Sequence, residues 1–202
     1  MKVDVNTFLI TYDALPGDIM NAHALWGSSC DTTAAECNGD GDEKIEYTAA
    51  GTQDVEAFRA QQHLYLSGIM SFDASGYATT AGVGVIGTNI LASSVFDKVG
   101  YTIFYDGALY SGSYKRTNSI LIGASDSSIA LNSSFKFPRY AALTPRQAYM
   151  IDVKIDDGIS VKGKFWAGNG WDGSAWMDCR DDATSYNLDE NSKQCAPSYT
   201  ID

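Results

Sequence analysis

The sequence is short of positive charge and of long apolar runs. Of its 202 residues, 14 are Lys or Arg and 25 are Asp or Glu, which gives a net charge of −11. Nucleic-acid binding draws its affinity from clustered cations, so this balance argues against a nucleic-acid partner. No stretch of about eighteen apolar residues occurs, and the sequence as given predicts no membrane-spanning helix. Its first residues, Met1-Lys2-Val3-Asp4, look like a start placed inside a longer protein.

Histidine is scarce, and the cysteines lack the spacing of metal ligands. His23 and His63 have no metal-spaced partner, and no CxxC pair occurs, which argues against a structural zinc site. His63 falls inside a predicted helix beside Leu64, so we interpret it as a core or interface histidine. The four cysteines form one local pair near each end of the chain: Cys30 with Cys37, and Cys179 with Cys195.

Each cysteine pair encloses a polar loop with few apolar residues, which favours these two disulfides among the three possible connectivities. Disulfides are typical of exported proteins, so the pairs predict a periplasmic or extracellular location. The alternative is four free thiols in a cytosolic protein.

Motifs for nucleophilic catalysis and nucleotide binding are also lacking. No GxSxG or SxxK occurs, and residues 82–87 fit GxGxxG only within a strand-like run. A hydrolase alternative rests on Asp152 and Asp156, which share one face of a predicted helix. With Asp157 and Gly158 they more simply form a turn that ends the helix. The sequence therefore predicts no enzyme and no catalytic residue.

What the sequence does contain is enough apolar material for a core. Hydrophobic residues make up 45% of the chain, and 19 glycines with many aromatics favour a β-rich body with frequent turns. The length fits a single domain over residues 1–202. A first helix is predicted within residues 1–15, because four apolar residues follow helical spacing: Val5, Phe8, Leu9 and Tyr12.

The remaining elements follow from changes in periodicity. Residues 52–70 predict a second helix with Thr52 as its N-cap, and residues 145–156 predict a short helix behind Thr144-Pro145. Strands are predicted within residues 83–167, at 83–90, 99–106, 119–124 and 160–167. Residues 16–51 and 168–202 are predicted as loop regions. This order of elements predicts an α+β fold with the first helix packed on an antiparallel sheet.

One acidic loop carries the most suggestive chemistry. Asn38, Asp40 and Asp42 alternate with glycine and precede Ile45, as in the opening of an EF-hand loop. The sixth and twelfth loop positions do not fit an EF-hand, because they hold Glu43 and Ala49. A calcium site completed by other carboxylates is one interpretation, and a solvated acidic turn beside a disulfide is the other. The calcium interpretation uses five residues: Asn38, Asp40, Asp42, Glu46 and Glu56.

Three groups of residues occur in the order found in type IV pilin-like proteins, a class that includes the type II secretion pseudopilins. The first runs from Phe8 to Gly27 and contains Ala14-Leu15-Pro16-Gly17-Asp18. The second is the Gly/Asp-rich loop at residues 38–42, followed by a helix with His63-Leu64. The third begins at Leu143-Thr144-Pro145 and includes Ile155-Asp156-Asp157-Gly158. These segments resemble the soluble globular part of such a protein over about half the chain.

The resemblance implies a pilin-like α+β fold with an additional helix and long disulfide-bounded loops. It implies a structural subunit of a pilus-like or pseudopilus filament, whose partners are other pilin or pseudopilin subunits in a homo- or hetero-polymer. The basic leader and apolar helix of the family are not in this sequence, so contact with a membrane would come only through such a preceding helix. Some pseudopilins bind calcium in a different, C-terminal loop, and the resemblance assigns no ligand to residues 38–56.

A second class of function is a secreted binding module or adhesin. Three tryptophans lie around the glycine-rich C-terminal region, where they form a candidate glycan-binding platform: Trp166, Trp171 and Trp176. Packing of a loop-rich surface is the alternative role for them.

Overall fold

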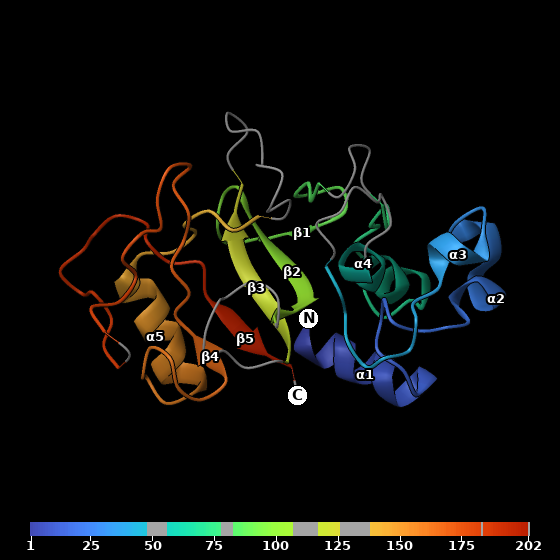
Figure 1. Cartoon of the computed structure of the whole chain (residues 1–202), viewed down its shortest axis with the longest axis horizontal. Helices are drawn as coiled ribbons and strands as arrows, with labels where there is room; N and C mark the ends of the chain where they lie inside the picture. The colour runs from blue at the N-terminus through green and yellow to red at the C-terminus, as the bar shows by residue number, and fades with distance from the viewer. Residues whose placement is uncertain (48–55, 78–82, 107–116, 126–137, 183, 202) are drawn as a thin grey trace.

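The computed structural model describes residues 1–47, 56–77, 83–106, 117–125, 138–182 and 184–201. Its centre is a five-stranded sheet in the order β1-β2-β3-β5-β4, in which every neighbouring pair is antiparallel (Figure 1). The strands are β1 (Leu91–Ala92), β2 (Val99–Tyr105), β3 (Asn118–Ala124), β4 (Phe165–Trp166) and β5 (Ser198–Thr200). The chain is therefore an α+β protein with an antiparallel sheet, as predicted.

The two long central strands agree with the prediction and the others differ from it. β2 and β3 fall within one residue of residues 99–106 and 119–124. Residues 83–90 do not form the predicted strand, because the amides of Thr88, Asn89 and Ile90 all donate to the Val85 carbonyl and close a turn. Of residues 160–167 only β4 pairs as a strand. β5 lies in the predicted C-terminal loop region and pairs with both β3 and β4.

The first helix, α1 (Lys2–Tyr12), packs against α4 (Glu56–Leu66) and shares a core cluster with residues of the sheet. Val5 and Phe8 are fully buried in a core cluster with sheet residues such as Ile103 and Leu121, and Tyr12 packs partly buried against it. Leu9 was predicted on the same buried face but is 41% exposed. The outer face of α1 exposes two large apolar side chains among polar ones, since Val3 is 75% exposed and Ile10 is 85% exposed, with Asn6 and Thr7 exposed between them. The helix ends at Asp13, whose left-handed φ of 53° breaks it ahead of Pro16.

The second helix, α4 (Glu56–Leu66), lies between α1 and the sheet residues of β2. Eight of its residues, Ala57 to Leu64, are buried. This confirms most of the helix predicted at residues 52–70, but the helix ends at Leu66, because Gly68 takes a left-handed φ of 73° and the amides of Ile69 and Met70 turn back to the Leu64 carbonyl. Thr52 and its neighbours lie outside the described residues. The predicted loop at residues 16–51 contains three one-turn helices: α2 (Ala22–Trp26), η1 (Gly27–Ser29) and α3 (Ala34–Cys37). Elements this short leave no periodic pattern in a sequence.

The third helix, α5 (Pro145–Ile155), lies on the other side of the sheet from α1 and α4 in Figure 1. Thr144 and Gln147 form a reciprocal capping box at its start, and Pro145 occupies the first turn. A second core cluster joins α5 to β4 and the C-terminal disulfide; its members include Leu143, Ala148, Phe165 and Cys195. In the described ranges, no helix has the length and apolar character needed to cross a membrane.

Candidate functional site

Both predicted disulfides are formed. Cys30 bonds to Cys37 and Cys179 bonds to Cys195, which uses all four cysteines of the chain. Each of these cysteines is buried. Disulfides persist in oxidising compartments, so the two bonds support a periplasmic or extracellular location.

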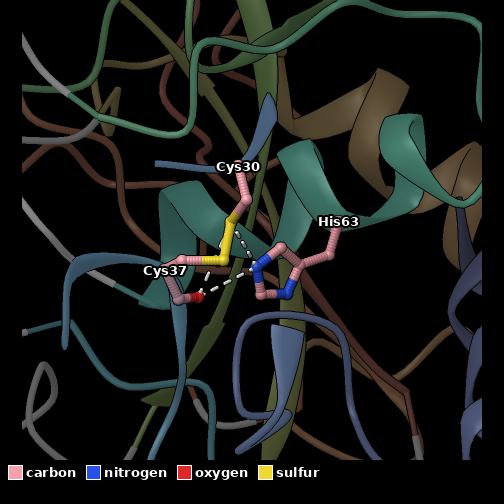
Figure 2. A group of neighbouring side chains, drawn as sticks. All are labelled: Cys30, Cys37 and His63. Atoms are coloured by element: carbon pink, nitrogen blue, oxygen red, sulfur yellow. Dashed lines mark hydrogen bonds between the residues drawn. A yellow bond between two sulfur atoms is a disulfide. The ribbon is translucent and has the colours of Figure 1, made fainter. Parts of the chain in front are cut away.

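His63 projects from α4 onto the Cys30–Cys37 disulfide (Figure 2). Its Nδ1 accepts a hydrogen bond from the Gly17 amide at 3.0 Å, and its Nε2 lies 3.2 Å from the Cys37 carbonyl oxygen. An acceptor at Nδ1 and a carbonyl at Nε2 require the neutral tautomer with its proton on Nε2. Burial, together with the charge of Arg59, lowers the pKa of His63 to about 3. His63 is therefore a neutral core residue, as the sequence predicted.

The disulfide and His63 do not form a metal site, although their sulfur and nitrogen atoms lie close together. A metal would need a thiolate, and both sulfur atoms are already bonded to each other. The ring of His63 instead packs beside aromatic rings, with centroid distances of 6.5 Å to Phe8 and 5.1 Å to Trp26. His63 thus joins α1, the 17–37 segment and α4.

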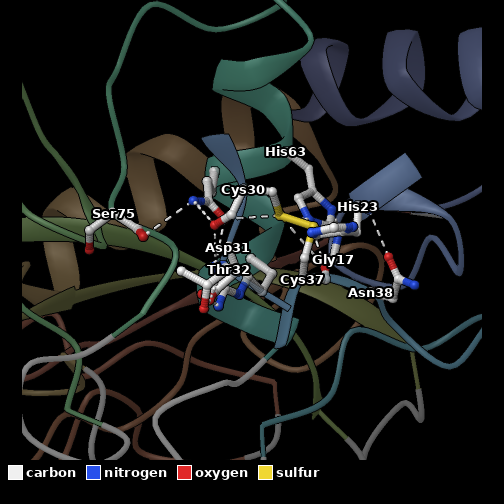
Figure 3. The surroundings of a disulfide bond; sticks show 11 residues. Gly17, His23, Cys30, Asp31, Thr32, Cys37, Asn38, His63 and Ser75 are labelled. Carbon is white, nitrogen blue, oxygen red and sulfur yellow. Dashed lines mark hydrogen bonds and ion pairs between the residues drawn. A yellow bond between two sulfur atoms is a disulfide. The ribbon is translucent and has the colours of Figure 1, made fainter. Parts of the chain in front are cut away.

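A buried polar network lies on the other side of the same disulfide (Figure 3). Arg59, which is 2% exposed, donates to the Cys30 carbonyl at 2.9 Å and forms an ion pair with Asp31. Burial opposes ionisation of Asp31, but the hydrogen bonds and charge around it, mainly those of Arg59, lower its pKa overall. Gln62 also donates to the Cys30 carbonyl at 2.9 Å. The network fixes the loop closed by the first disulfide.

Asp18 organises the acidic loop that follows. One of its oxygens accepts hydrogen bonds from the amides of Gly41 and Asp42, and the other accepts one from Glu43. The chain approaches so closely that a Cβ on Gly39 would overlap the Cα of Asp18. Burial raises the pKa of Asp18 despite these hydrogen bonds. Sequence reasoning missed Asp18, whose only signal is its place at the end of the Ala14–Asp18 run.

Three of the five predicted calcium ligands come together. Carboxylate oxygens of Asp40, Glu46 and Glu56 lie within 4.8 Å of one another. Glu56 accepts hydrogen bonds from the amides of Asp40 at 3.2 Å and Glu46 at 2.9 Å. Burial raises the pKa of Glu56 to about 7, and the negative charges of Asp18 and Asp40 act in the same direction. Burial, with the charges of Asp42 and Asp40, also raises the pKa of Glu46.

The other two predicted ligands are engaged differently. The side-chain oxygen of Asn38 accepts a hydrogen bond from the His23 amide at 2.8 Å, and Asp42 forms an ion pair with Lys44. Asp42 also belongs to an overlapping carboxylate group with Asp18 and Asp40. These oxygen atoms are of the type that a hard cation such as Ca²⁺ takes as ligands. Calcium at this cluster stays a prediction.

The second acidic group, at the end of α5, has structural partners. Asp152 is buried and accepts hydrogen bonds from the Tyr186 hydroxyl at 2.6 Å and the Gly158 amide at 3.2 Å. Asp156 accepts hydrogen bonds from the amides of Lys164 and Phe165. These carboxylates tie α5 to β4 and to the C-terminal loop. These contacts are those of a turn that ends the helix, and the hydrolase alternative stays a prediction.

The tryptophans of the C-terminal region are partly covered. The rings of Trp171 and Trp176 meet edge to face at 5.3 Å, and the Arg139 guanidinium lies 3.9 Å from the centre of the Trp176 ring. Trp166 is half-buried on β4. A cleft of about 390 Å³ beside Trp171 is also lined by Tyr140 and Asp97. An aromatic ring with flanking polar groups is the chemistry of a small glycan site.

Comparison with known proteins finds no similarity at a significant level: no protein-family profile, no curated protein and no solved structure matches the chain.

Proposed function

We propose that the chain is the globular part of a structural subunit of a type IV pilus-like or type II secretion pseudopilus filament. The observation that carries the proposal is that α1 exposes large apolar side chains on the face turned away from the core. Its inner face lies in the core through Val5 and Phe8, whereas Val3 and Ile10 on its outer face are exposed.

The outer face of α1 has no cover within the described part of the chain. Val3 and Ile10 are seven residues apart, which places them on one side of the helix two turns from each other. Exposed apolar patches mark sites of contact with other chains. In a filament of the kind that the resemblance implies, neighbouring subunits cover this face and the rest of the domain is displayed outside.

Two further features support the proposal. The disulfides fit a chain that works in the periplasm or outside the cell. The order of the elements also fits: an N-terminal helix, an antiparallel sheet and a disulfide-bounded C-terminal loop follow one another. This structural role involves no catalysis, so it asks for none from the acidic groups at residues 40–56 and 152–157.

Filaments sheared from cells of the source organism test the proposal. An antibody raised against residues 1–202 should label them, and the chain should sediment with them. Ile10→Asp should abolish incorporation, because it places a charge in the subunit contact, while Ser174→Asp in the exposed C-terminal loop should not. A chain found only as a free monomer, with filaments unchanged when its gene is deleted, would contradict the proposal.

The alternative proposal is a secreted glycan-binding module, which the cleft beside Trp171 favours. It predicts glycan binding by the isolated domain, measured on a glycan array, and loss of that binding in Trp171→Ala. Trp176→Ala is the matched control, since Arg139 already covers one side of that ring. If the native domain and Trp176→Ala both bind no glycan on the array, the alternative is wrong.

A further inference from the structure

Two separate surfaces of the domain combine exposed apolar side chains with charge of one sign. The first, the α1 patch, is formed by Leu9, Ile10 and Met20 with Asp13 and Glu43. Ile10 is 85% exposed and Met20 is 66% exposed. Leu9, Met20 and both acidic residues line a cavity of about 570 Å³ between the end of α1 and the ends of β2 and β3. The α1 patch is thus a hollow of mixed apolar and acidic lining, with Ile10 exposed on the helix beside it.

The second surface, the α5 patch, is formed by Arg146, Tyr149, Met150, Val153 and Lys154. Met150 is 65% exposed and Val153 is 53% exposed. The two basic residues lie four residues before and four residues after Met150, so helical spacing places all three on one face of α5. Within the described residues neither basic side chain forms an ion pair. The α5 patch is an apolar ridge with a cation near each end.

We infer that the α5 patch of one copy of this chain packs into the α1 patch of a second copy. The occupant is a second copy because both surfaces expose apolar side chains and their charges are of opposite sign. A net charge of −11 makes two copies repel each other, so contact is favoured where cations of one meet anions of the other. Arg146 and Lys154 are placed to meet Asp13 and Glu43.

Contact between two identical patches is disfavoured by the same charges. Two α1 patches would bring Asp13 and Glu43 together, and two α5 patches would bring Arg146 and Lys154 together. The contact is therefore heterologous, with different surfaces on the two copies. In Figure 1, α1 and α5 lie on opposite sides of the sheet, so each copy has one patch left to bind the next. A heterologous contact whose rotation does not close produces an open filament.

This inference rests on the proposed filament function and names the surfaces that build it. The test uses two single-cysteine variants of the chain, Ile10→Cys and Met150→Cys, mixed and treated with a flexible bifunctional maleimide. The native cysteines are all in disulfides, so only the introduced thiols react. We expect the product that joins residue 10 of one copy to residue 150 of the other. Ser174→Cys, exposed in the C-terminal loop, is the control.

Charge exchange gives the second part of the test. Arg146→Glu with Lys154→Glu in the Met150→Cys variant should reduce the mixed product about tenfold. Asp13→Lys with Glu43→Lys in the Ile10→Cys variant should restore it when the two altered proteins are mixed. Circular dichroism checks that each variant is folded. A yield no greater than that of Ser174→Cys, or equal amounts of 10–10 and 150–150 products, would overturn the inference.

The two levels of the proposal fail in different ways. If the chain is present in sheared filaments but the 10–150 product is absent, the contact is wrong and the filament function stands. If the 10–150 product forms but the chain is absent from filaments, the filament function is wrong, and with it the inference that this contact builds a fibre.

Discussion

The backbone amide of Gly17 donates a hydrogen bond to Nδ1 of His63, a residue 46 positions later in the chain. The other nitrogen of the same ring faces the Cys37 carbonyl. One neutral imidazole therefore connects the turn after α1, the first disulfide and the most buried helix. Together with Arg59 and Gln62, which donate to the Cys30 carbonyl, His63 holds these segments together.

Replacement of His63 by Phe should destabilise the domain by roughly 2–4 kcal/mol. The aromatic ring is kept, but the Gly17 amide and the Cys37 carbonyl lose their buried partner. Urea unfolding followed by tryptophan fluorescence measures the change. His23→Gln, at a half-buried position, should change stability by no more than about 0.5 kcal/mol. Equal losses in the two variants would show that the two hydrogen bonds do not matter.

Glu56 should make the domain less stable as the pH rises from about 4.5 to about 7. Its pKa is about 7 in the folded chain against 4.5 as its ordinary value, so the folded state holds the proton more tightly across this range. Glu56→Gln should remove this loss and be more stable than the native chain above pH 7. Allowing for its partial exposure, we expect on the order of 1 kcal/mol.

The difference between Glu56→Gln and the native chain should shrink towards pH 4.5. His63 acts in the opposite sense, because its pKa of about 3 in the folded chain makes stability fall as the pH drops below 6.5. The comparison of Glu56→Gln with the native chain cancels the His63 effect. The measurement is the free energy of unfolding of both proteins at several pH values. A difference between them that stays constant from pH 4.5 to pH 8 would contradict the prediction.

Millimolar calcium should raise the melting temperature of the domain at pH 7.5. Burial, with repulsion among the carboxylates, raises the pKa of Glu46 and Glu56, and a cation at Asp40, Glu46 and Glu56 would stabilise their charged forms. Calcium at ten times its dissociation constant adds about 1.4 kcal/mol, or a few degrees for a domain of this size. Asp40→Asn with Glu46→Gln should abolish the effect, whereas Asp172→Asn should not. An unchanged melting temperature means that no calcium site exists there.

Loss of the Cys179–Cys195 disulfide should cost about 3 kcal/mol of stability, since it closes a loop of about fifteen residues. The Cys30–Cys37 disulfide closes a shorter loop, so its loss should cost about 2.5 kcal/mol of stability. The paired variants Cys179→Ser/Cys195→Ser and Cys30→Ser/Cys37→Ser can be compared by urea unfolding. A larger loss in the second pair would show that contact with His63 outweighs loop closure there.

The long elements of the fold could be predicted from the sequence, and the short ones could not. α1, α4 and α5 are each eleven residues, and β2 and β3 are each seven, so their periodicity is readable. β1, β4 and β5 have only two or three residues. β5 pairs with β3, about 80 residues earlier, and its Ser-Tyr-Thr sequence has no apolar alternation that would reveal it.

The acidic site was likewise predicted only in part from the sequence. The alternation of Asn38, Asp40 and Asp42 indicated a site that Glu46 and Glu56 would complete, and the oxygens of Asp40, Glu46 and Glu56 do lie together. Asp18 joins them because Gly39 lets two stretches of backbone pass within contact distance. Nothing in local spacing reports such an approach. Asn38 has the right spacing, but its side chain accepts a hydrogen bond from the backbone of α2.

The loop closed by Cys179 and Cys195 is held at its ends and near its middle. The disulfide and the pairing of Cys195 with the Leu143 backbone fix the ends to the second core, and Asp152 of α5 holds Tyr186 near the middle. On either side of Tyr186, Asp181, Asp189 and Lys193 face solvent. Substitutions at these outer positions can accumulate over generations without weakening the domain. The exposed surface of this loop can therefore change in sequence while the contacts that hold the fold together stay the same.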